Sequence, residues 1–184
     1  MRFRLIARSD FPRLSHWLRQ PHVARWWADD ASLAGIEADY GPSVDGTEPS
    51  EVFIVEHEGR DIGLAQRYFV HAYPQYVEEL RSLVAVPDGA CSIDYLIGEA
   101  GDTRRGWGTQ LIAQFSSKLW ADWPRAQSIV VPVHAENIAS HRVLERGGYV
   151  RAAHGELTPD NPRDTREHFV FVCDRPKLSG TTRT

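Results

Sequence analysis

The chain has 184 residues, of which 42% are hydrophobic and 25% are charged, and its formal net charge is −4. These values are typical of a soluble globular protein, and we expect residues 1–176 to form one domain, followed by a polar, disordered tail over residues 177–184. The acidic net charge argues against a nucleic-acid-binding protein, and the lack of a long apolar run argues against a membrane protein.

Two cysteines, Cys91 and Cys173, each lie within an apolar run. Buried free thiols in a reducing compartment are the ordinary interpretation of such a pair. The N-terminus is charged throughout and lacks the apolar core of a signal peptide. We therefore expect a cytoplasmic protein.

Charge is divided unevenly between the two halves of the chain. Residues 1–100 contain 16 acidic and 9 basic side chains (−7), whereas residues 101–184 contain 9 acidic and 12 basic ones (+3). A basic half suits a phosphate-bearing cofactor, and an acidic half suits a cationic partner. A solvated acidic surface would explain the asymmetry equally well.

The first half of the chain predicts a strand, three helical segments and a hairpin. We expect the strand over residues 3–7, a helix capped by Ser9, and helical segments over residues 22–27 and 31–40, the last one ending in a loop at Gly41-Pro42. Strands over residues 52–57 and 61–70, joined tightly at Gly59, predict an antiparallel hairpin. Residues 71–90 show no firm period and predict a long loop, which in a compact domain is often functional.

The most informative stretch runs from Cys91 to Thr109 and combines a strand, a turn and a glycine loop. It leads into a predicted helix over residues 110–121, which has one apolar stripe. Glycines at the start of a helix let an anion approach its unpaired N–H groups closely, and neighbouring arginines add charge. An ordinary strand-to-helix turn with solvated arginines would fit the loop taken alone.

After this helix the sequence predicts a strand over residues 128–133, a helix over 137–146, and strands over 149–153 and 168–173. The loop motif Arg105-Gly106-Trp107-Gly108-Thr109, together with Asn137, Ser140, Glu145, Gly148 and Tyr149 at their spacing, resembles the GCN5-related N-acetyltransferases (GNAT). This resemblance covers residues 90–155. It implies an α/β (α+β) fold with a mixed, mostly antiparallel central sheet flanked by helices, in which the strands around the glycine-loop helix splay apart to admit acetyl-CoA.

The resemblance also implies a set of cofactor-binding residues. The backbone at the end of the central strand would pair with the pantetheine arm, the glycine loop would bind the pyrophosphate, and an asparagine would contact the cofactor, although helix capping alone would explain that asparagine. These residues are Tyr95, Leu96, Ile97, Arg104, Arg105, Gly106, Trp107, Gly108, Thr109 and Asn137.

Segments 22–27, 40–44, 62–68 and 92–94 resemble, in this order, aminoglycoside 6′-N-acetyltransferases, over roughly residues 10–153. The resemblance implies that Asp94 is the general base and that Trp27 and Gln66 line the substrate pocket. Alternatively, Asp94 could be a solvent-facing acid at a sheet edge, and Gln66 could be a surface residue. We expect only one of Trp26 and Trp27 to face the pocket. Acidic side chains near the first helices and in the long loop are candidates for binding a polycation: Asp29, Asp30, Asp39, Glu78 and Glu79.

Two positions depart from those enzymes. Pro132 stands where they carry a substrate-binding acid, and Leu144 stands where they carry a tyrosine suited to protonating the departing thiolate. Tyr149 is expected to be a core residue. The sequence therefore names no general acid.

The resemblance implies an acetyl-CoA-dependent N-acetyltransferase that acts on a cationic small-molecule amine, with the 6′-amine of an aminoglycoside as the favoured acceptor and antibiotic resistance as the consequence. We expect a monomer or a homodimer. Eight histidines show no pair at metal-ligand spacing, so we expect no metal. The rival hypotheses are an acyltransferase for a lysine side chain or a siderophore precursor, and a non-catalytic acyl-CoA-binding module.

Overall fold

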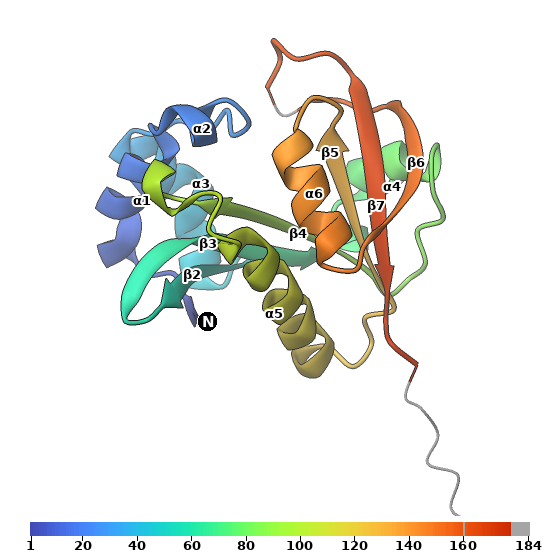
Figure 1. Ribbon diagram of the computed structural model, residues 1–184, viewed down its shortest axis with the longest axis horizontal. Helices are drawn as coiled ribbons and strands as arrows, with labels where there is room; N and C mark the ends of the chain where they lie inside the picture. The colour runs from blue at the N-terminus through green and yellow to red at the C-terminus, as the bar shows by residue number, and fades with distance from the viewer. Residues whose placement is uncertain (160, 178–184) are drawn as a thin grey trace, which may run out of the picture.

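The computed structural model describes residues 1–159 and 161–177 (Figure 1), and the predicted tail beyond Lys177 lies outside the described residues. Within them, seven strands form one sheet in the order β1-β2-β3-β4-β5-β7-β6. The β4–β5 pair is parallel and every other neighbouring pair is antiparallel, which confirms the predicted mixed sheet. The strands are β1 (Arg2–Leu5), β2 (Glu51–His57), β3 (Arg60–Phe69), β4 (Ala90–Ile97), β5 (Ser128–His134), β6 (Val150–Glu156) and β7 (Glu167–Asp174).

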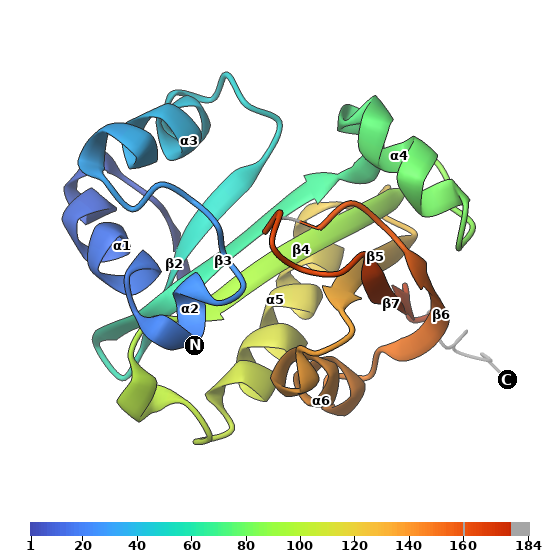
Figure 2. The same ribbon diagram turned by 90° about the horizontal axis from the view of Figure 1, so that it is seen from above.

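Helices cover both faces of the sheet, and each face takes its own set (Figure 2). One face carries α1 (Phe11–Leu18), α2 (Pro21–Ala24), α3 (Leu33–Asp45) and α4 (Pro74–Arg81), and we call it the α1–α4 face. The other carries α5 (Trp107–Asp122) and α6 (Ile138–Arg146), and we call it the α5–α6 face. Short 3₁₀ helices are η1 (Arg8–Asp10), η2 (Val70–Ala72) and η3 (Ala100–Asp102).

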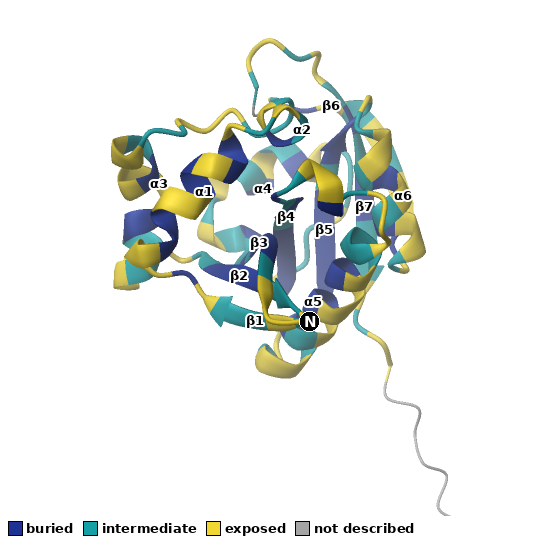
Figure 3. Ribbon diagram, turned by 60° about the vertical axis from the view of Figure 1, so that its left-hand side comes forward, coloured by how far each residue is buried: buried dark blue, intermediate teal, exposed yellow. Residues whose placement is uncertain are grey.

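Buried residues, dark blue in Figure 3, lie along the strands and on parts of the helices, and many of them are apolar. One cluster joins the sheet to α5 and α6, a second lies beneath α1 and α3, and a third lies beneath α4. Alternation along β4 divides its side chains between these clusters, because successive residues of a strand point to opposite faces. Ile93 joins the cluster under α5 and α6, whereas Leu96 joins the one under α1 and α3.

Strands β4 and β5 separate after a short paired segment. Their parallel register contains Ala90 opposite Ser128 and Cys91 opposite Ile129. Beyond these residues the two strands diverge (Figure 1), as the resemblance implied. Among the described residues, the edge of β4 that faces β5 therefore has no strand partner after Cys91, so a ligand can pair with the backbone there.

Helix α3 is longer than predicted. It continues through Gly41 and Pro42 to Asp45, so the loop expected at this dipeptide is wrong. Ile36 and Tyr40 are buried on the inner side of the helix, and their packing outweighs the hydrogen bond lost at the proline. The helix ends at Gly46, whose φ of 69° gives the left-handed conformation common after a helix.

The expected long loop over residues 71–90 is also wrong in part, because it contains helix α4. Pro74 occupies the first turn of this helix, where its missing N–H costs nothing. Val77 and Leu80 are buried, and their spacing of three residues is too short a pattern to stand out in the sequence. The helix matters for function because it fixes where Glu78 and Glu79 point.

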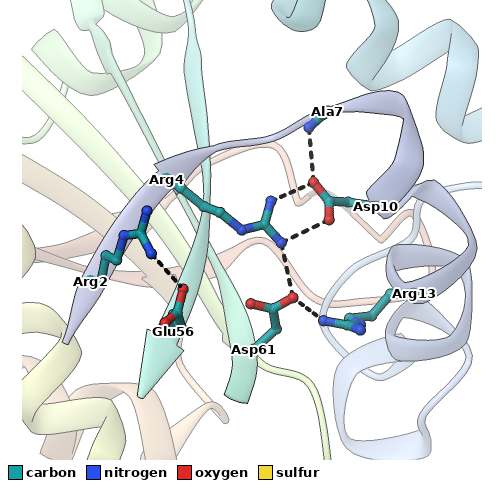
Figure 4. A network of polar contacts seen from close by, with 7 residues as sticks. All are labelled: Arg2, Arg4, Ala7, Asp10, Arg13, Glu56 and Asp61. Atoms are coloured by element: carbon teal, nitrogen blue, oxygen red, sulfur yellow. Dashed lines mark hydrogen bonds and ion pairs between the residues drawn. The ribbon is translucent and has the colours of Figure 1, made fainter. Parts of the chain in front are cut away.

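The start of the chain is fixed by an ion-pair network (Figure 4). Ser9 does not cap α1 as predicted; instead the Asp10 carboxylate accepts hydrogen bonds from the Ala7 N–H at 2.9 Å and from Arg4 at 2.7 and 2.8 Å. Burial opposes ionisation of Asp10, but the bonds from Arg4 and Ala7 hold its pKa below its usual value. Arg4 also binds Asp61 at 2.9 Å, which joins β1 to β3. Arg13 of α1 pairs with Asp61 as well.

Helix α1 in turn supports the end of β4. A Cβ atom at Gly98 would lie 2.2 Å from the Trp17 indole nitrogen, so the backbone after β4 lies directly against this buried ring. Trp17 is 1% exposed. The ion-pair network therefore holds the helix whose tryptophan fixes where β4 ends.

Candidate active site

A cavity of about 1410 Å³ follows the opening between β4 and β5. Its lining comes from α2, α3, β3, α4, β4, the glycine loop, β5 and α6. The cavity therefore joins the acidic first half of the chain to the basic second half. Its two ends differ in chemistry.

One end is the start of helix α5, three residues earlier than predicted. Gly106 is the N-cap residue with a φ of 79°, and no side chain caps the helix there. The N–H groups of the first turn thus have no partner within the helix and carry its positive end. Gly106, Gly108 and Thr109 line the cavity. This is the geometry of an anion site.

The two glycines of this loop serve different purposes. Gly106 is needed for its left-handed backbone, and a Cβ atom there would meet nothing within 4 Å. A Cβ atom at Gly108 would lie 3.2 Å from Cγ2 of Val143, so Gly108 also lets α5 approach α6. A bulky residue at Gly108 would consequently disturb helix packing as well as any ligand.

Arginines near the glycine loop stay without carboxylate partners. In the described part of the chain this holds for Arg104, Arg105 and Arg146. Other arginines, such as Arg19 and Arg125, also have no carboxylate partner there, whereas Arg4, Arg8, Arg25, Arg60 and Arg67 pair with acids. Arg104 and Arg146 line the cavity. Arg105 instead lies 5.2 Å from the Trp107 ring, and that ring packs 4.9 Å from His57. Neither Arg105 nor Trp107, both predicted to bind the cofactor, is among the described residues that line the cavity.

Asp94 and Gln66 lie opposite each other on β4 and β3. Gln66 Nε2 donates a hydrogen bond of 2.7 Å to Asp94 Oδ2, and both side chains line the cavity. Asp94 is half-buried on a central strand, so it is not a solvent-facing acid at a sheet edge. Gln66 is likewise not a surface residue. The structure thus brings these two predicted site residues into direct contact.

The other end of the cavity is acidic and aromatic. Tyr68 lies 5.1 Å from Tyr73 and 6.1 Å from Tyr76, ring centre to ring centre. Burial raises the pKa of Tyr68, and the charge of Asp94 adds to the effect. Burial and the hydrogen bond to Glu48 together raise the pKa of Tyr73 to about 12, and burial contributes more. These phenols therefore stay neutral beside carboxylates near neutral pH.

Further carboxylates and aromatic rings enter this end from the first helices. Asp29 accepts a hydrogen bond of 2.6 Å from the Tyr40 hydroxyl, and both line the cavity. Asp39 lines it too, whereas Asp30 is exposed and accepts a hydrogen bond from the Ser32 N–H at 2.8 Å. Trp26 and Trp27 both line the cavity, so the expectation that one alone would face it is wrong.

Helix α4 separates the two glutamates predicted to bind substrate. Glu79 lines the cavity and accepts a hydrogen bond of 2.6 Å from Thr158. Glu78 is on the exposed side of the helix, where it pairs with Arg81 at 3.3 Å. Successive residues of a helix point in different directions, so Glu79 faces the cavity and Glu78 faces solvent.

The cavity lining includes Ser140 and His22, two residues that sequence analysis did not assign to the site. Asn137 caps α6 by accepting the Ser140 N–H at 3.2 Å, and both line the cavity with Tyr95, Leu96 and Ile97. The Tyr95 hydroxyl lies 2.6 Å from Ser140 Oγ. His22 Nε2 donates to the Ile97 carbonyl at 2.8 Å. No periodicity could have indicated the contacts of Tyr95 and His22, because each joins distant segments. The cap at Asn137 is local.

The two departures noted in the sequence lie at different depths. Pro132 lines the cavity, as a substrate-binding side chain would, whereas Leu144 is fully buried in the core. Among residues 1–159 and 161–177, no group of three or more histidine, cysteine, aspartate or glutamate side chains is placed to hold a metal ion. No helix in that part of the chain is long and apolar enough to cross a membrane.

Comparison with known proteins gives a consistent picture. The model of the acetyltransferase (GNAT) domain matches residues 7–157. The aminoglycoside N(6′)-acetyltransferase type 1 of Klebsiella pneumoniae is 29% identical over 174 residues, which cover 90% of this chain and 83% of that protein. The protein of the same name from Serratia marcescens matches with the same identity and coverage. The crystal structure of aminoglycoside acetyltransferase AAC(6′)-Ib with coenzyme A and kanamycin superposes with a TM-score of 0.79 at 27% identity, covering 94% of each chain. Spermidine N-acetyltransferase from Vibrio cholerae, at 14% identity and a TM-score of 0.72, shares the fold.

The anion site can be tested with inorganic pyrophosphate alone. A ligand that binds the folded state raises the melting temperature, so pyrophosphate should stabilise the protein. Neutralising two cavity-lining charges in Arg104→Gln/Arg146→Gln should remove most of this increase. Arg125→Gln is the matched control, because Arg125 is exposed and lies outside the cavity lining in the described residues. An equal increase in all three proteins would contradict an anion site at this helix.

Proposed function

The chain belongs to the GNAT acetyltransferase family, and from this premise we propose that it transfers the acetyl group of acetyl-CoA to the 6′-amine of an aminoglycoside, which would confer antibiotic resistance. The observation that carries the proposal is the position of Asp94 in the cavity. It lies between an anion-binding helix terminus and an acidic, aromatic compartment. A phosphate-bearing acyl donor fits the first and a polycationic amine fits the second.

The residues at the basic end suit acetyl-CoA, which supplies an activated acetyl thioester. First-turn amides of α5, with Arg104 and Arg146, would hold its phosphates. Over residues 95–97 the edge of β4 that faces β5 has no strand partner among the described residues, so backbone groups there would pair with the amides of the pantetheine arm. The Ile97 carbonyl is the exception, because it accepts a hydrogen bond from His22 at 2.8 Å. This pairing would place the thioester beside Asp94.

Asp94 is proposed as the general base. An ammonium group cannot attack a carbonyl until it loses a proton, and a carboxylate within hydrogen-bond reach can accept that proton directly or through water. Gln66 fixes one carboxylate oxygen by its 2.7 Å bond, which holds the side chain pointing into the cavity. The reaction needs this fixed orientation because proton transfer depends on short, aligned contacts.

The acceptor compartment suits a multiply charged amine. Among the described residues, seven carboxylates line the cavity, and two of them, Asp102 and Asp164, pair with Arg60 and Arg25. The others are Asp29, Asp39, Glu48, Glu79 and Asp94. Each attracts cationic groups over about a Debye length, roughly 8 Å at physiological ionic strength. Neutral tyrosines and tryptophans add flat apolar surface against which sugar rings can pack. A monocationic amine would use only part of this surface.

The residue at position 132 supports an alternative class of acceptor. Pro132 removes an acid from the cavity wall, so a smaller primary amine, such as a lysine side chain or a siderophore precursor, is the alternative acceptor. A non-catalytic acyl-CoA-binding module has no need of a carboxylate held by Gln66 in the cavity, so the Asp94–Gln66 pair disfavours it.

The role of Asp94 gives a direct prediction. Asp94→Asn keeps the shape of the side chain and removes the proton acceptor, so kcat should fall by about 10²–10⁴-fold. The affinity for acetyl-CoA should hardly change, because the pantetheine contacts come from the backbone. Steady-state kinetics and calorimetric titration measure the two quantities. Asp88→Asn, at a fully exposed position, is the control. Wild-type turnover in Asp94→Asn would assign the proton to another group.

The separation of Glu79 from Glu78 gives a second prediction. Glu79→Gln should raise KM for kanamycin by about two- to fivefold at low ionic strength, since a partly exposed charge contributes about 0.5–1 kcal/mol. Glu78→Gln should leave KM unchanged. The difference between the variants should shrink as salt is added, because exposed charges are screened. If both substitutions raise KM equally, a diffuse acidic field and not the cavity wall attracts the substrate.

A further inference from the structure

Tyr95 follows the proposed base directly but faces the opposite side of the sheet. Asp94 shares its face with Leu96, which packs under α1 and α3 on the α1–α4 face. Tyr95 packs into the cluster formed with α5 and α6. Strand β4 therefore presents a carboxylate on one side and a phenol on the other, and both line the cavity.

The Tyr95 hydroxyl is held by helix α6. It lies 2.6 Å from Ser140 Oγ, and the Ser140 N–H is bound to the capping side chain of Asn137 at 3.2 Å. Ser140 is half-buried and lines the cavity, so its hydroxyl can exchange protons with water. Leu144 lies one helical turn further on and offers no proton.

The other tyrosines of the cavity are placed for a different task. Tyr40 is bound to Asp29, and Tyr73 is bound to Glu48. Tyr68 is on the same face of the sheet as Asp94, because its partner in β4 is Ser92. Tyr76 belongs to α4, on the same side. Among the described residues lining the cavity, Tyr95 is thus the tyrosine on the α5–α6 face, which also carries the uncapped start of α5.

We propose that Tyr95 protonates the coenzyme A thiolate as it leaves, and that Ser140 returns a proton to Tyr95. This assignment rests on the proposed acetyl transfer. Asp94 first passes the proton of the ammonium group to water, and the nitrogen lone pair then forms the C–N bond. Asp94 takes the second proton from nitrogen as the amide forms. The electron pair of the C–S bond moves to sulfur, which takes the Tyr95 proton. The phenolate is then reprotonated from water through Ser140, while Asp94 releases its proton to water. The net products are the acetamide and the free thiol.

The environment of Tyr95 keeps this proton in place between turnovers. Burial raises its pKa, the Ser140 hydroxyl opposes this, and the charge of Asp94 adds to the increase. The phenol is therefore fully protonated near neutral pH. A departing thiolate 
that receives its hydrogen bond is stabilised because hydrogen bonds to charged groups are stronger than neutral ones.

The chain contains a matched control for this residue. The Tyr149 hydroxyl lies 2.7 Å from Ser116 Oγ, in another buried tyrosine–serine pair. Tyr149 is 3% exposed and is outside the cavity lining in the described residues. Tyr95→Phe and Tyr149→Phe thus remove the same atom and the same type of hydrogen bond, one in the cavity and one in the core.

Turnover is the first test. Tyr95→Phe should lower kcat by roughly 10- to 100-fold, toward the lower end for proton-transfer catalysis because a thiolate leaves readily. The Kd for acetyl-CoA should stay unchanged. Tyr149→Phe should keep the wild-type kcat, and Ser140→Ala, which retains the phenol, should lower kcat less than Tyr95→Phe. Equal kcat in Tyr95→Phe and wild type would overturn the proposal.

The second test needs no acceptor amine. The thiol of bound coenzyme A is titrated by the ultraviolet absorbance of its thiolate. Losing a hydrogen bond to the thiolate should raise this pKa by about one unit in Tyr95→Phe. Tyr149→Phe and Ser140→Ala should match the wild type. An unchanged pKa in Tyr95→Phe refutes the role of Tyr95 without affecting the acetyl-transfer proposal, whereas failure to acetylate any aminoglycoside refutes the proposed acceptor without affecting this titration.

Discussion

The early separation of β4 from β5 is the constraint on which the rest of the site depends. Their pairing stops at Cys91 and Ile129, so among the described residues the rest of β4 has no strand partner on that edge. Unpaired backbone groups are costly when buried without a partner. A ligand that supplies those partners gains the corresponding free energy on binding. Because of the opening, the cavity reaches both faces of β4, and it is lined by Asp94 on one face and Tyr95 on the other.

The two helix layers keep the opening in place. Arg67, which is 3% exposed on β3, pairs with Asp122 at the end of α5 at 2.7 Å and lies 4.4 Å from the Trp123 ring. This fixes the far end of α5, so its first turn remains directed at the cavity. Across the opening, Arg25 after α2 binds Asp164 at 2.8 Å. Breaking a pair that involves a buried charge is strongly destabilising, which suits such pairs to defining one arrangement.

Sequence patterns predicted the sheet, the hairpin and the glycine loop because these follow from alternation, helical spacing and glycine placement. They failed where packing decides: α3 continues through Pro42 because its inner residues are buried, and α4 is too short to show a period. The candidate site was predicted in part through family motifs, which pointed to Asp94, Gln66 and the loop at Gly106. The contact of Tyr95 with Ser140 spans 45 residues of sequence and depends on the fold alone. The same holds for the opposite directions of Glu78 and Glu79.

The central claim is acetyl transfer to the 6′-amine of an aminoglycoside, and the position of the new amide tests it most directly. Purified protein, acetyl-CoA and kanamycin should give a single monoacetylated product, whose amide nuclear magnetic resonance assigns to the 6′-nitrogen. An analogue with a hydroxyl group at that position should compete with kanamycin for binding and release no coenzyme A thiol. Acetylation of this analogue as fast as of kanamycin, or no acetylation of either, would contradict the account.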